Sequence, residues 1–444
     1  MRASWHFCYK EAVSTPPLLI MLSIDGLRAD FIDDPTLDLP ALRGLIARGT
    51  RARRLTPVFP TVTWPCHTSI VTGVSPARHG ILGNLVFDRA SGQPVEHYGD
   101  RTGVPVLAPT LWDRLHARGE RTAGVCWPKT RGVAAVADNI PEFYEQELFE
   151  EYASRPLWTE LARKGLPVHR YGPWSKQHPL GPMQDWLTLE AARHLLAVRP
   201  PRLMLLHLLT LDSFQHDHGV GSPEARWALL QMDALLGRLL DTLAEGGRLD
   251  TTTLMVFGDH GFVNVDTRHH LNQVLREEKL LEVNGRGEIT SRRAWAAGNG
   301  GAAHVYVLDG APRTTVARLA ERFGALPGVD VIGAERFPAL GLPAPSPGSM
   351  QGDLMLAADD GVFLTGHATE EAAAGAPVYL AAHGHSPDLP LLGAALIMAG
   401  PGVRAGGRLD TVSMLDLAPT AARLLGVDLP GAERGPLVEA LAPS

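Results

Sequence analysis

The sequence predicts an α/β fold in which helices cover both faces of a mostly parallel central sheet. Three short apolar runs, PLLIMLSID, RLMLLHLLTLD and TTTLMVFGD, have the length and composition of strands that are buried on both faces. Segments with apolar residues at helical spacing separate these runs, as in parallel sheets with helical crossovers. We predict strands over residues 18–24, 121–127, 203–209 and 252–257, and helices over residues 41–48, 111–118, 141–154, 183–198 and 224–245.

The pattern changes between about residues 264 and 380. Segments such as AAHVYVLDG and VDVIGAERF indicate short strands around a helix over residues 314–323, and PALGLPAPSPGS is a Pro/Gly-rich loop. We interpret this region as a small lobe inserted into a catalytic domain of residues 17–444. The domain then resumes with the strand AALIMAG and a closing helix in MLDLAPTAARLLG, and residues 1–16 are expected to be a loose lead-in.

Composition excludes several classes of function. The net charge is -7 at pH 7 and no run of Lys and Arg would follow a polynucleotide backbone, so a polynucleotide partner is not expected. The three cysteines, Cys8, Cys66 and Cys126, form no CxxC pair, so neither a disulfide framework nor a thiolate zinc site is predicted. The N-terminus lacks the apolar core of a signal peptide, and no segment is long enough to span a membrane. We therefore expect a cytoplasmic protein, or an exported one if the start codon is misassigned.

Each of the three apolar runs ends in an aspartate, at Asp25, Asp212 and Asp259. His216 follows the second aspartate by four residues, and His260 directly follows the third. Because ligands of open α/β sheets collect outside the carboxyl ends of the strands, these side chains are expected to meet at one edge. Each pair alone is weak evidence, since an aspartate at a strand end often caps a turn. Together, carboxylates and imidazoles predict a divalent-metal site and metal-assisted hydrolysis.

The segment FPTVTWPCHTSIVTG, residues 59–73, contains a predicted helix over residues 65–72 that ends at Gly73. Thr63 therefore lies at or just before a helix N-terminus, where backbone N–H groups favour an anion. The Thr63 hydroxyl could be a helix cap. The same position also suits a nucleophile that attacks a phosphoryl group beside a metal ion.

At this point the sequence resembles a known family, the nucleotide pyrophosphatase/phosphodiesterase (type I phosphodiesterase) branch of the alkaline phosphatase superfamily. The motifs that carry the resemblance are IDGLRADF, FPTVTWPCHTSIVTG with ARHGILGN, LDSFQHDHG, FGDHGF, and AAHGHSPDLP followed by AGPG. They run from about residue 17 to residue 402 in the order of the family. The resemblance implies an alkaline-phosphatase-like three-layer sandwich with a site for two zinc ions.

The resemblance also implies a role for each matching residue. Thr63 would be the nucleophile, and Asn84 would donate a hydrogen bond to a phosphoryl oxygen together with the Thr63 backbone N–H. His385 is the main alternative to His383, which fits the spacing to the downstream AGPG. One zinc ion would be bound by Asp212, His216 and His383, and the other by Asp25, Asp259, His260 and the Thr63 oxygen.

Two positions beside the nucleophile depart from the family. Trp64 stands where the family often has Phe, and its ring would stack on a base or aryl group of the substrate, unless it is a core or lid tryptophan. Cys66 stands where Asn is frequent and is interpreted as a small buried residue. Most of the 18 histidines are expected to be structural. His67, His79 and His218 could orient metal ligands, whereas His207, His269 and His270 are assigned no function.

The expected activity is hydrolysis of phosphodiester or pyrophosphate bonds in nucleotides or related small phosphodiesters. A covalent phosphothreonine intermediate on a two-zinc site is expected, although Asp/His ligation also tolerates manganese or iron. Phosphomonoesterase or phosphonate hydrolase activity in the same superfamily is the alternative, and a binding protein that has lost turnover is a more distant one. Monoesterases usually need extra positive charge around the phosphoryl group, and no Arg directly adjoins Thr63 in the sequence. The oligomeric state is not predicted.

Overall fold

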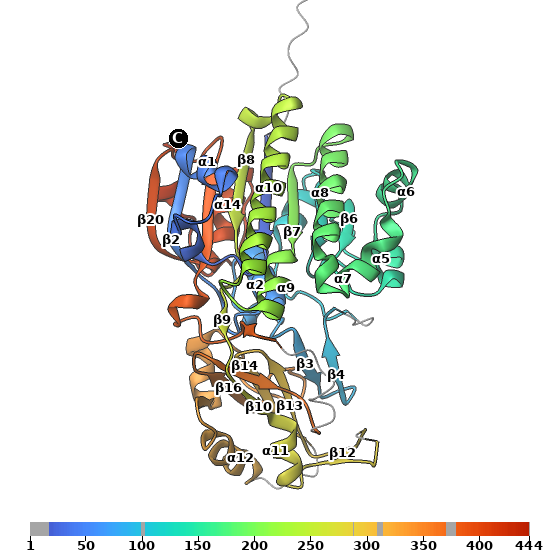
Figure 1. The fold of residues 1–444 in the computed structure, drawn as a ribbon, viewed down its shortest axis with the longest axis vertical. Helices are drawn as coiled ribbons and strands as arrows, with labels where there is room; N and C mark the ends of the chain where they lie inside the picture. Colours follow the sequence, from blue (N-terminus) through green and yellow to red (C-terminus); the bar gives the residue numbers. More distant parts are fainter. Residues whose placement is uncertain (1–16, 99–102, 287, 309–313, 370–378, 444) are drawn as a thin grey trace, which may run out of the picture.

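Eight strands form the central sheet of the computed structural model, which describes residues 17–98, 103–286, 288–308, 314–369 and 379–443 (Figure 1). Their order is β20-β2-β19-β8-β1-β7-β5-β6, and only β19 runs antiparallel to its neighbours. The prediction of a mostly parallel sheet is confirmed, while the predicted lead-in at residues 1–16 lies outside the described residues. The strands are β1 (Leu18–Ile24), β2 (Gly49–Thr56), β5 (Thr122–Trp127), β6 (Asp138–Pro141), β7 (Leu203–Leu208), β8 (Thr252–Phe257), β19 (Ala394–Ala399) and β20 (Gly407–Ser413).

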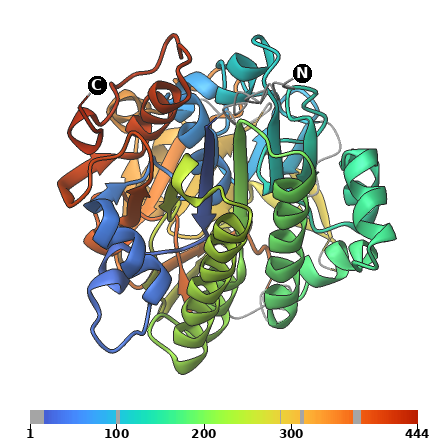
Figure 2. The ribbon, with the colours of Figure 1, turned by 90° about the horizontal axis from the view of Figure 1, so that it is seen from above.

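Helices cover both faces of this sheet and make three layers (Figure 2). Alternate side chains of β1 enter the two cores, Ile20 and Leu22 on one face and Leu19 and Met21 on the other. The first face packs against α1 (Pro40–Arg48), α5 (Gln146–Tyr152), α6 (Arg155–Arg163), α7 (Tyr171–Ser175), α8 (Gly181–Val198) and α10 (Pro223–Glu245). The second packs against α2 (Thr63–Thr72), α4 (Leu111–His116) and α14 (Leu417–Leu425).

One local expectation was wrong, and strand β2 was missed. The helix predicted over residues 141–154 begins later, because residues 138–141 pair with β5 as the edge strand β6 and α5 starts only at Gln146. Strand β2, with the sequence GTRARRLT, was not predicted. The strand was not recognised because its arginines interrupt the apolar pattern. Arg51 and Arg53 form ion pairs with Asp33 and Asp410 outside the core.

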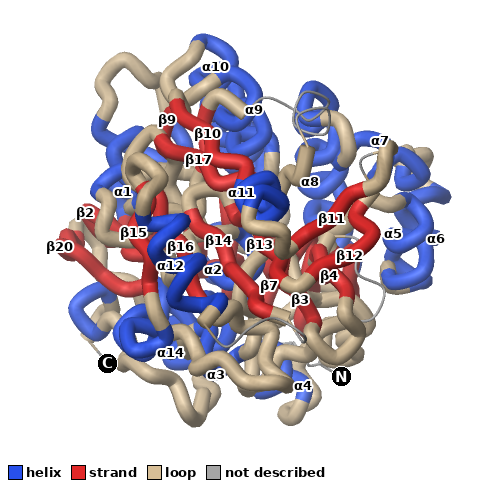
Figure 3. The backbone as a smooth tube through the Cα atoms, turned by 90° about the horizontal axis from the view of Figure 1, so that it is seen from below, coloured by secondary structure: helices blue, strands red, loops and turns tan. Residues whose placement is uncertain are grey.

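A smaller lobe lies between β8 and β19 in the sequence and below the main sheet in Figure 1. Its antiparallel four-stranded sheet, in the order β13-β14-β16-β15, is visible from below in Figure 3. Its strands and helices are β13 (Ala294–Asn299), β14 (Ala302–Val307), β15 (Val329–Ile332), β16 (Leu354–Ala358), α11 (Leu271–Glu277) and α12 (Thr315–Gly324). Short pairs complete it: β9 (Val263–Asn264) with β18 (Ala381–Ala382), β10 (Thr267–His270) with β17 (Val362–Thr365), and β11 (Leu281–Val283) with β12 (Ile289–Arg292).

The lobe has its own apolar core, which includes Trp295, Tyr306 and Phe323. Phe87, from the hairpin of β3 (Leu85–Asp88) and β4 (Gln93–Glu96), belongs to the same core and ties the segment after α2 to the lobe. Across the described residues, we find no helix that combines the length and apolar character needed to cross a membrane.

Candidate active site

Three neighbouring strands of the central sheet deliver the three aspartates to one edge. Strands β8, β1 and β7 are adjacent and parallel, so their carboxyl ends lie together. Asp25 follows β1, and its backbone N–H donates to the carbonyl of Leu208 at 2.9 Å, which extends the pairing to the site. After β7 the chain turns into α9 (Thr210–His218), which places Asp212 and His216 one turn apart.

The first group of candidate metal ligands consists of Asp25, Asp259 and His260. His260 Nε2 lies 3.3 Å from Asp25 Oδ1 and 3.2 Å from Asp259 Oδ2. Donors that surround a zinc ion tetrahedrally at its usual bond lengths are about 3.4 Å apart. All three atoms are buried without a hydrogen-bond partner among the described residues, which fits a shared cation.

Asp259 is oriented by its own backbone surroundings. Its Oδ1 accepts hydrogen bonds from the N–H of Gly26 at 3.2 Å and from that of His260 at 3.1 Å. These bonds leave Oδ2 as the oxygen that faces His260 and Asp25.

The second group consists of Asp212, His216 and His383. His216 Nε2 lies 3.6 Å from Asp212 Oδ2, and His383 Nε2 lies 3.6 Å from Asp212 Oδ1. The Nδ1 atoms of His216 and His383 bond to the carbonyls of Ala381 and Thr61 at 2.9 and 3.0 Å. Because a carbonyl only accepts, each Nδ1 carries the proton and each Nε2 is left with a lone pair for a metal.

The two groups are neighbours, since the rings of His260 and His383 stack with centroids 3.7 Å apart. His385, the predicted alternative, points elsewhere and bonds the carbonyl of Val362 through Nε2 at 2.8 Å. The geometry therefore brings together all six candidate metal ligands that the sequence predicted. His383, and not His385, lies with Asp212 and His216.

Burial makes this cluster unfavourable without a cation. Burial raises the pKa of Asp25 well above its ordinary range, and the charges of Asp212 and Asp259 raise it further. Burial likewise raises the pKa of Asp259 to about 7 and lowers the pKa values of His260 and His383. A divalent cation favours the ionised carboxylate and the neutral imidazole, so the donor set fits such an ion.

Thr63 and Asn84 lie on the same pocket as the candidate ligands. Thr63 is the first residue of α2, and it is buried. Asn84 Oδ1 accepts the backbone N–H of Trp64 at 3.0 Å, while its Nδ2 is directed to the hydroxyl of Tyr98 at 3.4 Å. The Tyr98 hydroxyl is also hydrogen-bonded to the Thr63 side chain. The Thr63 backbone N–H and Asn84 Nδ2 therefore lie as donors beside the Thr63 hydroxyl, an arrangement that can hold an anion.

The pocket has a volume of about 280 Å³ and is enclosed by both parts of the molecule. The main body contributes the ligands, Tyr98, Tyr144 and Trp174, and the lobe contributes Phe363 and residues 298–300. Two carboxylates, Glu96 and Glu142, also line it, and no lysine or arginine does so among the described residues.

Comparison with known proteins identifies the family. Residues 19–386 match the family model described as Type I phosphodiesterase / nucleotide pyrophosphatase. The chain belongs to this family. Human ectonucleotide pyrophosphatase/phosphodiesterase family member 7 is 25% identical over 262 residues, which are 56% of this chain and 49% of the relative. Rat family member 1 is 27% identical over 281 residues, which are 62% of this chain and 27% of the relative. The matches thus span about half and about a quarter of these relatives' lengths.

Solved structures of the type I phosphodiesterase family share the fold. The murine ectonucleotide pyrophosphatase/phosphodiesterase 5 structure superposes with a TM-score of 0.69 at 18% identity, covering 96% of this chain and 100% of that chain. The human protein 5 gives the same values. The expected alkaline-phosphatase-like fold is thereby confirmed.

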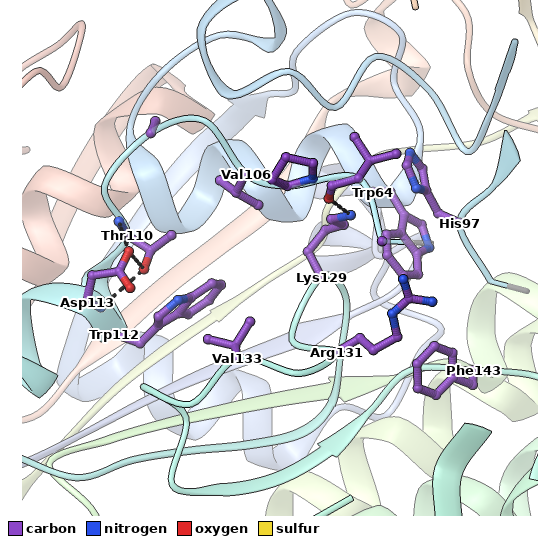
Figure 4. A pocket seen from close by; sticks show the side chains of 14 residues that line it. Trp64, His97, Val106, Thr110, Trp112, Asp113, Lys129, Arg131, Val133 and Phe143 are labelled. Carbon is purple, nitrogen blue, oxygen red and sulfur yellow. Dashed lines mark hydrogen bonds between the residues drawn. The ribbon is translucent and has the colours of Figure 1, made fainter. Parts of the chain in front are cut away.

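The Trp64 indole lies outside the pocket of the candidate ligands. It lines a second cavity of about 280 Å³, with Lys129, Arg131 and Phe143 (Figure 4). Its ring stacks on His97 at 5.1 Å between centroids, and the Lys129 ammonium lies 5.7 Å from the ring. Only 3% of Trp64 is exposed. The side chain that was expected to stack on a substrate is therefore packed as a core residue, the other interpretation of the sequence.

Several other predicted positions are structural. Cys66 is buried, as expected of a small core residue. His67 bonds the carbonyl of Thr63 through Nδ1 at 2.9 Å and Ser23 Oγ through Nε2 at 3.0 Å, so it braces α2 against β1. His79 Nε2 bonds Ser69 Oγ at 3.0 Å and so holds the segment that follows α2 against this helix.

Three residues at this site were not predicted from the sequence: Tyr98, Glu142 and His207. Tyr98 and Glu142 line the pocket, and His207 Nε2 lies 3.2 Å from Asp25 Oδ2. Only His207 left a signal, because a histidine interrupts the otherwise apolar strand LMLLHL. Tyr98 and Glu142 belong to no motif and reach the site through tertiary packing.

Proposed function

We propose that this chain is a zinc-dependent phosphodiesterase that cleaves nucleotides or related small phosphodiesters through a phosphothreonine intermediate on Thr63. The observation that carries the proposal is the shared site: a buried hydroxyl at the N-terminus of α2 lies beside two groups of Asp and His side chains. Four ligand atoms of these groups are buried without a hydrogen-bond partner among the described residues, namely Asp25 Oδ1, Asp212 Oδ1, Asp259 Oδ2 and His260 Nε2. Buried polar atoms in a purely structural site are normally hydrogen-bonded, so several unpaired ones at a single sheet edge favour a bound cation.

The residues present fit two zinc ions. Asp25, Asp259, His260 and the Thr63 oxygen would hold one ion, and Asp212, His216 and His383 would hold the other. When bound, such a pair of ions lowers the pKa of an attacking oxygen and stabilises charge on the leaving oxygen.

The reaction would proceed in two displacements at phosphorus. In the first, the Thr63 hydroxyl loses its proton to solvent and its Oγ1 forms a bond to phosphorus. The bond from phosphorus to the leaving oxygen breaks, and that oxygen departs with the electron pair, as a phosphate or, after it takes up a proton from solvent, as an alcohol. In the second, water attacks phosphorus, the bond to Thr63 Oγ1 breaks, and the hydroxyl is restored. Asn84 Nδ2 and the backbone N–H of Thr63, the first residue of α2, would hold the non-bridging oxygens in both steps.

The charge of the pocket supports a diester over a monoester substrate. A monoester presents one more charged phosphoryl oxygen than a diester, and its recognition normally uses an added cationic side chain. The described residues that line this pocket include no lysine or arginine, while Glu96 and Glu142 add negative charge. The charge of the pocket therefore favours phosphodiesterase activity over phosphomonoesterase or phosphonate hydrolase activity.

The relatives of this chain support nucleotides as substrates. Curated relatives are described as ectonucleotide pyrophosphatase/phosphodiesterases. A murine protein 5 structure was solved as an inactive threonine-to-alanine variant in complex with AMP. By analogy, a nucleoside monophosphate is a reasonable product for this chain.

The test is a substrate panel on zinc-loaded protein, with bis-p-nitrophenyl phosphate, p-nitrophenyl phosphate, dinucleotides and NAD. We expect kcat/KM for the diester to exceed that for the monoester by tenfold or more. Thr63→Ala should abolish hydrolysis while zinc content stays at the wild-type level. A preference for the monoester would reject the diesterase, and full activity in Thr63→Ala would remove Thr63 from its role.

A further inference from the structure

His207 lies in the middle of the central sheet at a position that should be apolar. It belongs to β7, whose other residues are Leu and Met, and it is fully buried. Strand β7 pairs with β1 so that His207 is opposite Ser23, two residues before Asp25. Burying an imidazole in an apolar strand costs free energy unless a partner compensates for it, so this residue calls for a physical explanation.

The ring of His207 lies between two carboxylates. Nε2 is 3.2 Å from Asp25 Oδ2, and Nδ1 is 3.8 Å from Glu142 Oε2. Both ring nitrogens and Glu142 Oε2 are buried, and within the described part of the chain they have no hydrogen bond of standard geometry, although the Cys126 carbonyl also lies near the ring as an acceptor. Glu142 directly follows the edge strand β6 and is 2% exposed. The three side chains thus form a line from the sheet edge to the candidate metal ligands.

The two oxygens of Asp25 face different partners. Oδ1 lies 3.3 Å from His260 Nε2, within the first ligand group, whereas Oδ2 faces His207. An N–H at His207 Nε2 directed to Oδ2 would fix the rotation of the carboxylate and leave Oδ1 for the metal. Partners that orient ligating side chains in this way typically contribute ten- to hundredfold to metal affinity.

His207 itself is a poor candidate for a further metal ligand. The nearest set that could hold an ion with it comprises His67 and Asp259. However, both ring nitrogens of His67 are already bonded, to the Thr63 carbonyl and to Ser23 Oγ. Its ring packs against the His207 ring at 4.3 Å and limits how far that ring can turn.

We infer that His207, backed by Glu142, is a positioning residue that orients Asp25 toward the metal it would share with Asp259, His260 and Thr63. The inference rests on the proposed function only in that the site binds two metal ions. It assigns to His207 no contact with substrate, so its loss should weaken one metal site and lower kcat while leaving KM nearly unchanged.

The decisive comparison is between His207→Gln and His207→Asn, measured by zinc titration of the metal-free protein with a chromophoric chelator as competitor. A Gln amide reaches about as far as Nε2, whereas an Asn amide reaches only about as far as Nδ1. We expect His207→Gln to bind both zinc ions within about threefold of wild type. His207→Asn should lose about ten- to hundredfold in affinity for one ion and retain the other.

His207→Phe removes the donor and keeps the ring volume, and it should behave as His207→Asn does. His194→Phe is the matched control, because His194 is also buried but pairs with Glu160 away from the pocket. Glu142→Gln should weaken the same ion by a smaller factor. Wild-type affinities at both sites in His207→Asn and His207→Phe would overturn the inference. If the wild-type chain binds no zinc, it is the proposed function that fails.

Discussion

The side-chain oxygen of Asn84 accepts the backbone N–H of Trp64 at 3.0 Å, one residue beyond the Thr63 hydroxyl. This bond fixes the orientation of the Asn84 amide, because Oδ1 is engaged and Nδ2 points to the Tyr98 hydroxyl at 3.4 Å, with its second N–H available to donate. Two elements separated by twenty residues are thereby joined at the N-terminus of α2.

From this relationship we predict that Asn84→Ala lowers kcat by about 10²–10³-fold, the loss typical of removing one oxyanion donor. Asn84→Asp should be at least as damaging, because a carboxylate keeps the acceptor but places negative charge where the amide donates. Steady-state kinetics with bis-p-nitrophenyl phosphate measure the effect, and zinc content serves as the control. An Asn84→Ala variant within threefold of wild-type kcat would show that Asn84 only holds α2.

The metal ligands could be predicted from sequence because each belongs to a local pattern. Asp25, Asp212 and Asp259 end apolar strands, and the parallel arrangement of those strands carries the aspartates to one edge. The assignment of His383 as a metal ligand was less clear from the sequence, since His385 lies two residues away. Two tertiary contacts decide between them. His383 bonds the Thr61 carbonyl, 322 residues earlier in the chain, and His385 bonds the Val362 carbonyl, 23 residues earlier.

Side chains placed by tertiary packing alone could not be predicted. Glu142 reaches the pocket because residues 138–141 join the sheet as an edge strand and α5 begins only at Gln146, whereas the sequence predicted a helix from residue 141 onward. The direction of the Trp64 ring depends on His97, which follows β4, rather than on the motif that contains Trp64. The same limit applies to β2, whose buried residues alternate with arginines that pair with distant aspartates.

The second prediction concerns the removal of zinc and the replacement of His383 or His385. Chelation should lower the melting temperature, since each zinc site contributes about 3 kcal/mol when free zinc exceeds Kd by a hundredfold. His383→Ala should bind one zinc ion per chain, whereas His385→Ala should still bind two, because the His385 ring bonds a carbonyl outside the ligand groups. Metal analysis after dialysis measures the stoichiometry. Loss of an ion in His385→Ala with retention in His383→Ala would reverse the assignment.

The third prediction concerns pH and Asp185, which bonds the first turn of α9. Its carboxylate accepts the N–H groups of Leu209 and Thr210, each at 2.9 Å, yet burial raises its pKa to about 6. The unfolded chain has a lower pKa, about 3.9, so the folded state holds the proton more strongly between these values. This group's contribution is therefore complete below pH 4 and is lost as pH rises through 6, by on the order of 3 kcal/mol.

The measurement for Asp185 is the free energy of unfolding from pH 4 to pH 8, in wild type and in Asp185→Asn. Other titrating groups affect both proteins alike, so the difference between the two curves isolates Asp185. We expect wild type to lose stability relative to the variant as pH rises from 4 to 6, and the difference to be constant above pH 7. Parallel curves over the whole range would contradict the assigned pKa.

The last prediction follows from Gly26, which directly succeeds Asp25 and has a φ of 69°. A Cβ at Gly26 would lie 2.7 Å from Gln215 Nε2 and 2.8 Å from the Phe262 ring, so both side chains would have to move. The Phe262 ring packs edge-on against His216 and His383, at 4.8 and 5.1 Å between centroids, and displacing it would shift those ligands.

Gly92, in the β3–β4 turn, is the matched control for this substitution, because it has the same φ of 69° and open space around its would-be Cβ. Gly92→Ala should lower the free energy of unfolding by about 1 kcal/mol, the backbone cost alone. Gly26→Ala adds crowding, so a loss of about 2–4 kcal/mol is expected, together with weaker zinc binding. Chemical denaturation with and without zinc separates the two effects. Equal losses in both variants, with unchanged zinc affinity, would show that the crowding around Gly26 relaxes without disturbing the ligands.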